Sequence, residues 1–313
     1  MAAKKVESGN SSGARRAVYT VLLGGYENFN DEIELFQENI EFICLTDNPD
    51  LRSGKWKIEL VKPAFPGDPI RSQRLLKLEG HPILESFDEL VYIDNSVTIT
   101  GPVEPIFNEW LEDTDICFPL HSFHQTVIDE FDAVLRLERD AHERVSEQLF
   151  HYNASNPEIF ASQPLWTGLF ARKNNVAVQQ FCRLWFLHVA RYSRRDQLSL
   201  PFVLAYSGKN LQVKTIALDN HRSDFHQWLW TDVQEGRPKN LSHANYEGTL
   251  PLMAEVTRLR NELAREREKS NLLMNQVSQL ELGLEQLRQH IEAVYATLSW
   301  RITAPLRKLR TRQ

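Results

Sequence analysis

The sequence is poor in cysteine and has no long apolar run. Its three cysteines, Cys44, Cys117 and Cys182, are far apart and form no Cys-x-x-Cys pair or Cys/His cluster, which argues against a zinc site or a disulfide framework. No segment approaches the roughly 18 consecutive apolar residues that a membrane-spanning helix needs. Residues 1–16 are polar and lack the apolar core of a secretion signal, so we expect them to be disordered. These absences predict a soluble, cytoplasmic protein with free thiols.

Positive charge is also scarce, except at the C-terminal end. The chain carries 36 Lys and Arg against 42 Asp and Glu, a formal net charge of −6. Residues 301–313 hold five of these cations and no acid, so residues 1–300 hold 31 basic and 42 acidic side chains, a net −11. Because an acidic body repels a polyanion, we expect no nucleic-acid partner.

Residues 17–239 alternate between apolar strands and helices. This alternation predicts an α/β fold with a mainly parallel sheet flanked by helices. Ligands of such sheets bind beyond the carboxyl ends of the strands, where Gly24-Gly25, Asp47 and Asp94 fall. The expected strands are Ala17–Leu23, Glu41–Leu45, Trp56–Val61, Leu90–Ile93, Asp115–Pro119, Trp166–Ala171 and Leu211–Ile216, and the expected helices are Ile70–Leu78, Gln125–Phe150, Val176–Tyr192 and Gln197–Tyr206.

Residues 252–299 carry a heptad pattern. Apolar residues occupy 12 of 14 positions spaced alternately four and three residues apart, and only Glu266 and Ser270 interrupt the series. A period of 3.5 residues over this length predicts a coiled-coil helix, and β-branched residues at a with leucine at d favour a parallel homodimer. The alternative is one amphipathic helix packed on the body. Pro251 marks the boundary, and residues 240–251 are expected to be a linker.

The segment LVYIDNSVTIT, residues 90–100, delivers Asp94 at the end of an apolar strand. A carboxylate there can hold Mg²⁺ or Mn²⁺, which prefer oxygen ligands, or a ribose hydroxyl. The alternative is an Asx-turn that only links two strands. Upstream, Arg71, Arg74 and Lys77 are three residues apart along one broad helix face. Three cations before a crevice carboxylate suit a diphosphate, and a solvated face is the alternative.

Several motifs, taken in order, resemble one known family. The stretches VYTVLLGGYENF, EFICLTDNP, RSQRLLKLEGHPILESFDELVYIDNSVTI, WTGLFARKN and RRDQLSLPFVL are similar to the glycosyltransferase-like domain shared by plant Golgi proteins and bacterial polysaccharide-cluster proteins. The resemblance covers roughly residues 17–230. It implies a GT-A-like, Rossmann-type domain that binds a nucleotide-sugar donor, usually with a divalent metal.

The resemblance assigns residues to the donor site. It places Asp94 at the first acid of the Asp-x-Asp motif, while Ser96 stands at the second, where a hydroxyl is a weaker ligand for Mn²⁺ or Mg²⁺. A late histidine, His221 or His226, would complete the metal shell, with His221 preferred; a hydrogen-bonded structural role is the alternative. The residues implied at the nucleotide-sugar are Gly24, Gly25, Tyr26 and Asp47 at the nucleoside, Arg71, Arg74 and Lys77 at the diphosphate, and Asn95, Trp166 and Gly168 along the donor.

The resemblance also implies catalytic roles. Asp196, in RRDQLSL, would contact the acceptor hydroxyl or act as the base of an inverting transfer, alongside Asp94. The alternative for Asp196 is the N-cap of the helix that it opens. His121 and His124 follow a strand and rank behind these residues as candidates for the border of the crevice.

The C-terminal stretch YATLSWRITAPLRKLR resembles a segment at the ends of many bacterial polysaccharide glycosyltransferases. Its aromatic and aliphatic residues beside five cations predict a basic amphipathic tail, residues 300–313, that binds an anionic membrane surface. A frayed basic end is the alternative. The expected location is peripheral, on the inner face of the cytoplasmic membrane.

Together these patterns predict a glycosyltransferase that moves a sugar from a nucleotide-sugar to a cell-surface polysaccharide or its lipid-linked precursor. The alternative is an inactive GT-A-like scaffold or chain-length module in a polysaccharide assembly complex. A nucleotidyltransferase is a third class, but GGYENF lacks the basic residue of its phosphate loop.

Overall fold

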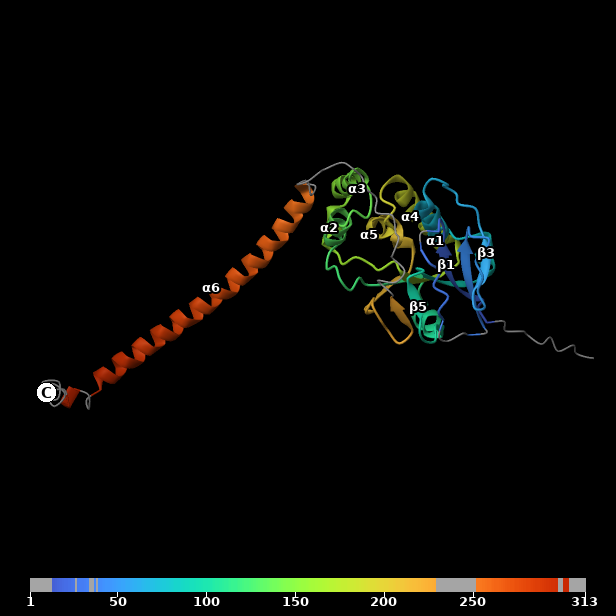
Figure 1. Cartoon of the computed structure of the whole chain (residues 1–313). Helices are drawn as coiled ribbons and strands as arrows, with labels where there is room; N and C mark the ends of the chain where they lie inside the picture. Colours follow the sequence, from blue (N-terminus) through green and yellow to red (C-terminus); the bar gives the residue numbers. More distant parts are fainter. Residues whose placement is uncertain are drawn as a thin grey trace, which may run out of the picture. The chain divides into compact units, whose positions relative to one another are not determined.

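A seven-stranded sheet with the order β3-β2-β1-β4-β7-β6-β8 forms the centre of the first of two units, Met1–Ala254 and Glu255–Gln313 (Figure 1). The computed structural model describes residues 13–25, 27–33, 37, 39–228, 252–297 and 301–303. Of the seven strands, β7 alone runs antiparallel to its neighbours, so the predicted mainly parallel α/β sheet is confirmed. The strands are β1 Arg16–Leu22, β2 Ile40–Thr46, β3 Lys57–Leu60, β4 Glu89–Ile93, β6 Ile116–Pro119, β7 Leu169–Lys173 and β8 Val213–Ile216.

Helices cover the sheet, and one predicted helix is divided into two in the structure. The segment expected as a single helix, Gln125–Phe150, covers α2 and the first part of α3, separated by a loop in which Glu138 has a φ of 50°. That left-handed conformation ends α2 without a glycine. The helices of this unit are α1 Pro69–Leu78, α2 Val127–Arg136, α3 His142–Ser155, α4 Val176–Arg191 and α5 Asp196–Ser207, with short turns η1 Pro82–Ser86, η2 Ile106–Trp110, η3 Pro157–Ala161 and η4 Gly208–Asn210.

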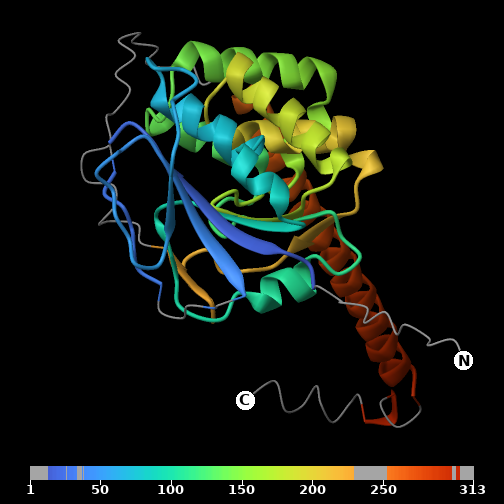
Figure 2. The ribbon, with the colours of Figure 1, turned by 90° about the vertical axis from the view of Figure 1, so that its right-hand side faces the viewer.

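The strands send apolar side chains into two cores, one on each face of the sheet. Tyr19 and Val21 of β1 enter the first core, while Val18 and Leu22 enter the second, because successive strand residues point to opposite faces. Helices α1, α4 and α5 complete the first core, and Figure 2 shows them together on one side of the sheet. On the other face, η2 packs beside a small sheet made of β5 Val97–Ile99 and β9 His226–Trp228.

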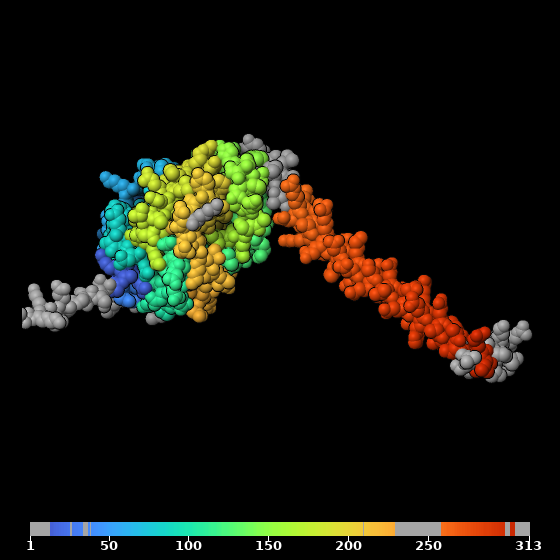
Figure 3. Space-filling view, turned by 180° about the vertical axis from the view of Figure 1, so that it is seen from behind, coloured from blue at the N-terminus to red at the C-terminus, as the bar shows by residue number. Residues whose placement is uncertain are grey.

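A third core joins the peripheral helices to the sheet layer. Phe131 of α2 and Leu149 and Tyr152 of α3 pack around Leu198 of α5. In the space-filling view, the green segment that contains α2 and α3 lies beside the gold segment that leads to β9 (Figure 3). The segment after β6 is thereby held next to the start of α5, which is the arrangement that builds the site described below.

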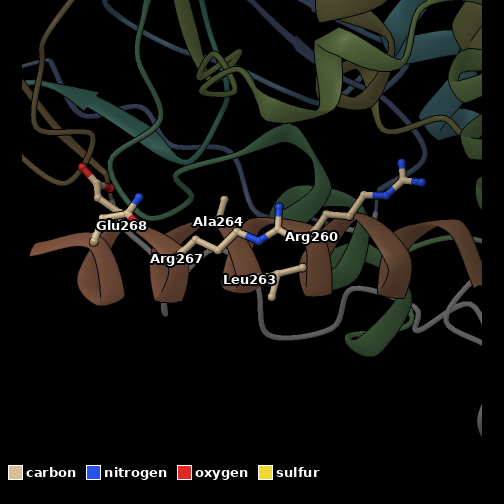
Figure 4. A pocket seen from close by; sticks show the side chains of 6 residues that line it. Arg260, Leu263, Ala264, Arg267 and Glu268 are labelled. Carbon is tan, nitrogen blue, oxygen red and sulfur yellow. The ribbon is translucent and has the colours of Figure 1, made fainter. Parts of the chain in front are cut away.

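One helix, α6 Leu252–Ala296, supplies most of the second unit, and its large apolar side chains from Leu259 onward are exposed. Leu280 is 69% exposed and Leu284 is 62% exposed, as expected of a heptad seam without a partner chain. A shallow hollow on this helix is lined by Arg260, Leu263, Ala264, Arg267, Glu268 and Asn271 (Figure 4). Among the helices in the described ranges, none combines the length and apolar character that crossing a bilayer requires.

Several sequence predictions fall on residues that the structure does not describe. The expected linker, residues 240–251, lies outside the described residues, as do residues 1–12 of the expected disordered segment and all but residues 301–303 of the basic tail. The cysteines are all described, and each is free and buried. Burial raises the pKa of Cys44 and of Cys117 to about 12, so these thiols stay protonated at neutral pH.

Candidate functional site

The ends of β1 and β2 meet in a glycine turn. Gly24 and Gly25 follow β1 with φ of 79° and 62°, values that glycine adopts without steric cost. The backbone N–H of Gly24 lies 3.1 Å from each carboxylate oxygen of Asp47, which follows β2. The structure therefore brings these three predicted residues together at the carboxyl edge of the sheet. Tyr26, predicted beside them, lies outside the described residues.

A buried centre of ion pairs lies beside this edge. Lys77 of α1 is fully buried, and its Nζ lies 2.7 Å from Oδ2 of Asp196 and 3.6 Å from Oδ1 of Asp94. Arg74, one turn earlier in α1, places Nε 3.1 Å from Oδ1 of Asp196. Three residues predicted at the donor, Arg74, Lys77 and Asp94, thus converge with Asp196, which was predicted at the acceptor. The Asp94 side chain, 31% exposed, is the member of this ion-pair centre that faces solvent.

Charge inside the ion-pair centre is balanced at neutral pH. Burial opposes ionisation of Asp196, but the cations of Arg74 and Lys77 outweigh it and hold the pKa of this carboxyl well below its usual range. The same two cations also lower the pKa of Asp94 against the effect of burial. Burial lowers the pKa of Lys77, and the two carboxylates oppose that shift.

Two tyrosines hold the ion-pair centre in place. The hydroxyl of Tyr19 in β1 donates a hydrogen bond to the backbone carbonyl of Lys77 at 2.6 Å. The hydroxyl of Tyr92 in β4 donates to Oδ1 of Asp94 at 2.7 Å, and its ring centroid lies 4.6 Å from the Lys77 ammonium. Burial raises the pKa of Tyr92 well above its usual value, so the phenol remains a donor. The two central strands therefore fix both α1 and Asp94.

Arg71 does not join Arg74 and Lys77. Six residues of α-helix leave about 120° between the directions of Arg71 and Lys77, so the predicted shared face is too narrow to include both. The Arg71 guanidinium instead pairs with Asp68 at 2.6 Å and donates to the carbonyls of Val189 and Tyr192. It joins α1 to the end of α4, which is a structural role in this arrangement.

Asp196 is not the N-cap of its helix. The N-cap of α5 is Arg195, which makes no side-chain cap hydrogen bond, and Asp196 is the first helical residue. Its carboxylate points to Arg74 and Lys77 rather than to free backbone N–H groups, because two buried cations attract it more strongly. With only 3% of its side chain exposed, this carboxylate has little access to a bound acceptor.

The residues after Asp94 are engaged with other parts of the chain. The buried amide of Asn95 accepts a hydrogen bond from the Asn30 backbone N–H at 2.9 Å and donates to the Asn28 carbonyl at 2.8 Å. The hydroxyl of Ser96 accepts a hydrogen bond from Nε1 of Trp228 at 3.0 Å. Asn95 and Ser96 therefore anchor the loop after β1 and the strand β9.

The two predicted late histidines, His221 and His226, lie in different surroundings. His226 is fully buried, with Nδ1 2.6 Å from the Ser223 hydroxyl and Nε2 3.3 Å from the Asn220 carbonyl, so both ring nitrogens are engaged. His221 is exposed, with its ring centroid 4.7 Å from that of Phe123. Asp94 is a single carboxylate already paired with an ammonium, which does not fit a divalent ion in this arrangement.

Within the described ranges, one group of at least three potential metal-ligand side chains lies within 4.8 Å: His121, His124 and Glu130. Nδ1 of His124 lies 2.5 Å from Oε2 of Glu130, and Nε2 of His121 lies 3.9 Å from the same oxygen. Nδ1 of His121 accepts the backbone N–H groups of Phe123 and His124, so its proton is on Nε2, facing Glu130. Hydrogen bonds thus engage Nδ1 of both histidines. Glu130 is not among the residues predicted from the sequence, because an acid in the first turn of a helix is usually solvated.

Trp166 and Gly168 lie just before β7, which begins three residues later than predicted. The buried Trp166 ring packs against His226 and Trp228 at 5.4 and 5.8 Å between centroids. A side chain on Gly168 would place its Cβ 2.7 Å from Cε2 of Trp166, so only glycine lets the ring lie there. The carbonyl of Gly168 accepts the backbone N–H of Asp94 at 2.7 Å, which joins this loop to the ion-pair centre.

Comparison with known proteins identifies the family of the first unit. No curated protein matches the chain. The family model described as TOD1/MUCI70, glycosyltransferase-like domain, matches residues 24–226, which include every residue of the ion-pair centre and most of the sheet. This match bears out the resemblance drawn from the motifs of the body, while the resemblance of the C-terminal segment stays a prediction. The chain therefore belongs to the TOD1/MUCI70 family of glycosyltransferase-like domains.

Proposed function

We propose that this protein is a glycosyltransferase that moves a sugar from a nucleotide-sugar to a cell-surface polysaccharide or its lipid-linked precursor. One observation carries the proposal: two cations of α1 and two carboxylates converge at the carboxyl edge of the sheet in a family of glycosyltransferase-like domains. Ligands of α/β sheets bind at this edge. Sugar transfer builds negative charge on the departing diphosphate, and fixed cations stabilise such charge in a water-poor site.

The proposed roles of these residues differ with their burial. Asp94, the exposed member of the ion-pair centre, is placed to accept a hydrogen bond from a sugar or ribose hydroxyl. Lys77 and Arg74 lie beneath it and contribute positive potential toward the diphosphate. The turn at Gly24 and Gly25 leaves room for a nucleoside close to the backbone. No step here depends on a metal ion.

Binding and hydrolysis of nucleotide-sugars test this proposal. Purified protein is titrated with a panel of UDP- and GDP-hexoses, with and without Mn²⁺, and slow donor hydrolysis is followed. Asp94→Asn should weaken donor affinity about tenfold or more, because a hydrogen bond to a charged group contributes about 1.5–3 kcal/mol. Asp132→Asn, which changes an exposed acid of α2, is the matched control. If no donor binds or turns over and Asp94→Asn changes nothing, the enzyme proposal fails.

A second candidate, an inactive scaffold, is favoured by the side chains after β4. The Ser96 hydroxyl is bound to Trp228, and Asp94 is paired with Lys77, so the Asp-x-Asp pattern is not available as a metal site in this arrangement. On this proposal the exposed apolar seam of α6 is the surface that binds other proteins of a polysaccharide assembly complex. Metal-independent binding of a donor without turnover would favour the scaffold over the enzyme.

We also propose that α6 pairs in parallel with a second copy of the chain. Its heptad residues Leu273, Val277 and Leu280 are all more than half exposed. In a parallel pair, Glu262 at g of one helix faces Arg267 at e of the other, which is an attractive contact. The basic C-terminal tail would then give each pair two attachments to an anionic membrane, at the inner face of the cytoplasmic membrane.

A further inference from the structure

The histidine and carboxylate next to the ion-pair centre form an oriented pair. Glu130 lies in the first turn of α2 with 2% of its side chain exposed. Burial opposes ionisation of Glu130, but its hydrogen bond with His124 and the charge of Arg195 outweigh burial and lower the pKa of the carboxyl. An ionised carboxylate only accepts hydrogen bonds, so Nδ1 of His124 must donate the one that spans 2.5 Å.

This hydrogen bond determines whether Nε2, the other ring nitrogen of His124, carries a proton or a lone pair. With the proton on Nδ1, a neutral ring carries its lone pair on Nε2. Nε2 has no hydrogen-bond partner among the described residues, and 23% of the side chain is exposed. A histidine held by a buried carboxylate, with its second nitrogen open, is the arrangement that enzymes use to accept a proton.

The pair lies beside the ion-pair centre rather than in a separate part of the fold. Arg195 exerts its charge on both Glu130 and Asp196. Phe123, next to His124, contacts the Trp228 ring at 6.1 Å between centroids, and Trp228 binds Ser96, two residues after Asp94. The loop after β6 is therefore linked through Trp228 to the residues that follow β4.

We propose that His124 is the proton acceptor of the transfer reaction and that Glu130 is its positioning residue. This inference rests on the proposed glycosyltransferase function. The acceptor oxygen forms a bond to the anomeric carbon as the bond from that carbon to the diphosphate oxygen breaks. The bonding electron pair leaves with the diphosphate, and the acceptor's proton passes to Nε2 of His124. Direct displacement of this kind inverts the anomeric configuration.

His124 fits this role better than Asp196, the base suggested by the sequence. Asp196 is bound to two cations and buried, whereas His124 is partly exposed and has an open nitrogen. The charged and titratable groups around the pair are His121 on the same loop, Arg139 after α2 and Arg195 before α5.

The test measures donor hydrolysis, with water as the acceptor, on full-length protein and a UDP- or GDP-hexose that binds. His124→Asn should lower kcat about 10²–10⁴-fold, with donor affinity within about threefold of wild type. Imidazole added to His124→Ala should restore part of the rate. The sugar released first by wild type should have the inverted configuration in NMR. His290→Asn, an exposed histidine of α6, is the control.

A double variant separates chemistry from folding. His124→Asn alone leaves the Glu130 carboxylate buried without its main partner, whereas His124→Asn/Glu130→Gln removes charge and base together. The double variant should unfold at the wild-type temperature yet be as inactive as the single one. Wild-type rates in His124→Asn, or a loss of rate that imidazole does not restore in His124→Ala, would overturn this inference alone. So would stoichiometric Zn²⁺ binding that depends on His124 and activates the enzyme. Failure of wild type to bind any donor would instead remove the proposed function and this inference with it.

Discussion

Replacing Asp196 with asparagine should strongly destabilise the first unit. The carboxylate bridges Nε of Arg74 at 3.1 Å and Nζ of Lys77 at 2.7 Å, and the Lys77 side chain is fully buried. Removing one partner of a buried ion pair costs about 3–5 kcal/mol, because the remaining charge stays buried without compensation. Asp94, 3.6 Å from Nζ, offers partial compensation, so we expect a loss near about 3 kcal/mol. In a domain of this size that lowers Tm by about 6–12 °C.

Urea and thermal unfolding followed by circular dichroism measure this loss. Asp132→Asn is the matched control. Asp132 is 43% exposed and forms a long ion pair of 3.8 Å with the exposed Arg136, so this substitution should lower the free energy of unfolding by less than about 0.5 kcal/mol. Lys77→Met combined with Asp196→Asn removes the stranded ammonium as well and should recover more than half of the lost stability. An Asp196→Asn variant within about 1 kcal/mol of Asp132→Asn would refute the reasoning.

The Asp196 carboxylate should also make the free energy of unfolding fall as the pH is lowered. Because the pKa of Asp196 is lower in the folded chain than in the unfolded chain, the unfolded chain takes up this proton first as pH falls. The contribution of Asp196 is present above about pH 4, the usual value of an aspartate, and is lost as pH falls further toward the folded value. Wild type should therefore lose more stability between about pH 5 and pH 3 than Asp196→Asn does.

Three further outcomes are expected. Gly168→Ala should cost about 1–3 kcal/mol in urea unfolding because its Cβ would lie 2.7 Å from the Trp166 ring, while Gly54→Ala, in open space, should cost far less. Sedimentation equilibrium should show a dimer for wild type and a monomer for Leu280→Lys, and a monomeric wild type at micromolar concentration would contradict the pairing. Deleting residues 300–313 should abolish binding to anionic liposomes in a flotation assay, and unchanged binding would remove the membrane proposal.

Much of the fold could be predicted because local patterns coincide with it. The apolar run of β1 and the alternation of β3 are visible in the sequence, and both strands form where expected, within one residue. The split between α2 and α3 could not be predicted in the same way. Asp140, in that loop, accepts hydrogen bonds from the Ser193 hydroxyl and the Arg194 backbone N–H, contacts more than 50 residues away in sequence.

The site was predictable in its members but not in its pairings. Arg74, Lys77 and Asp94 stand out as charged residues around a strand end, but nothing local shows that Asp196 neutralises two of them. Glu130 carries no sequence signal at all, since its burial depends on the approach of His124 and Arg195. The exposure of a charged side chain depends on the tertiary structure. The roles of Asp94, Asp196 and Glu130 could therefore not be predicted from the sequence alone.

The ion-pair centre has a consequence for how the chain folds. It joins α1, the end of β4 and the start of α5, and Asp196 lies about a hundred residues or more beyond its partners in sequence. A nascent chain that has made only its first strands holds Lys77 without its main counter-ion, and closing so long a loop is entropically costly before that partner arrives. Contacts of this range slow folding and make it cooperative. Lys77 therefore gains its main counter-ion only when α5 has joined the sheet.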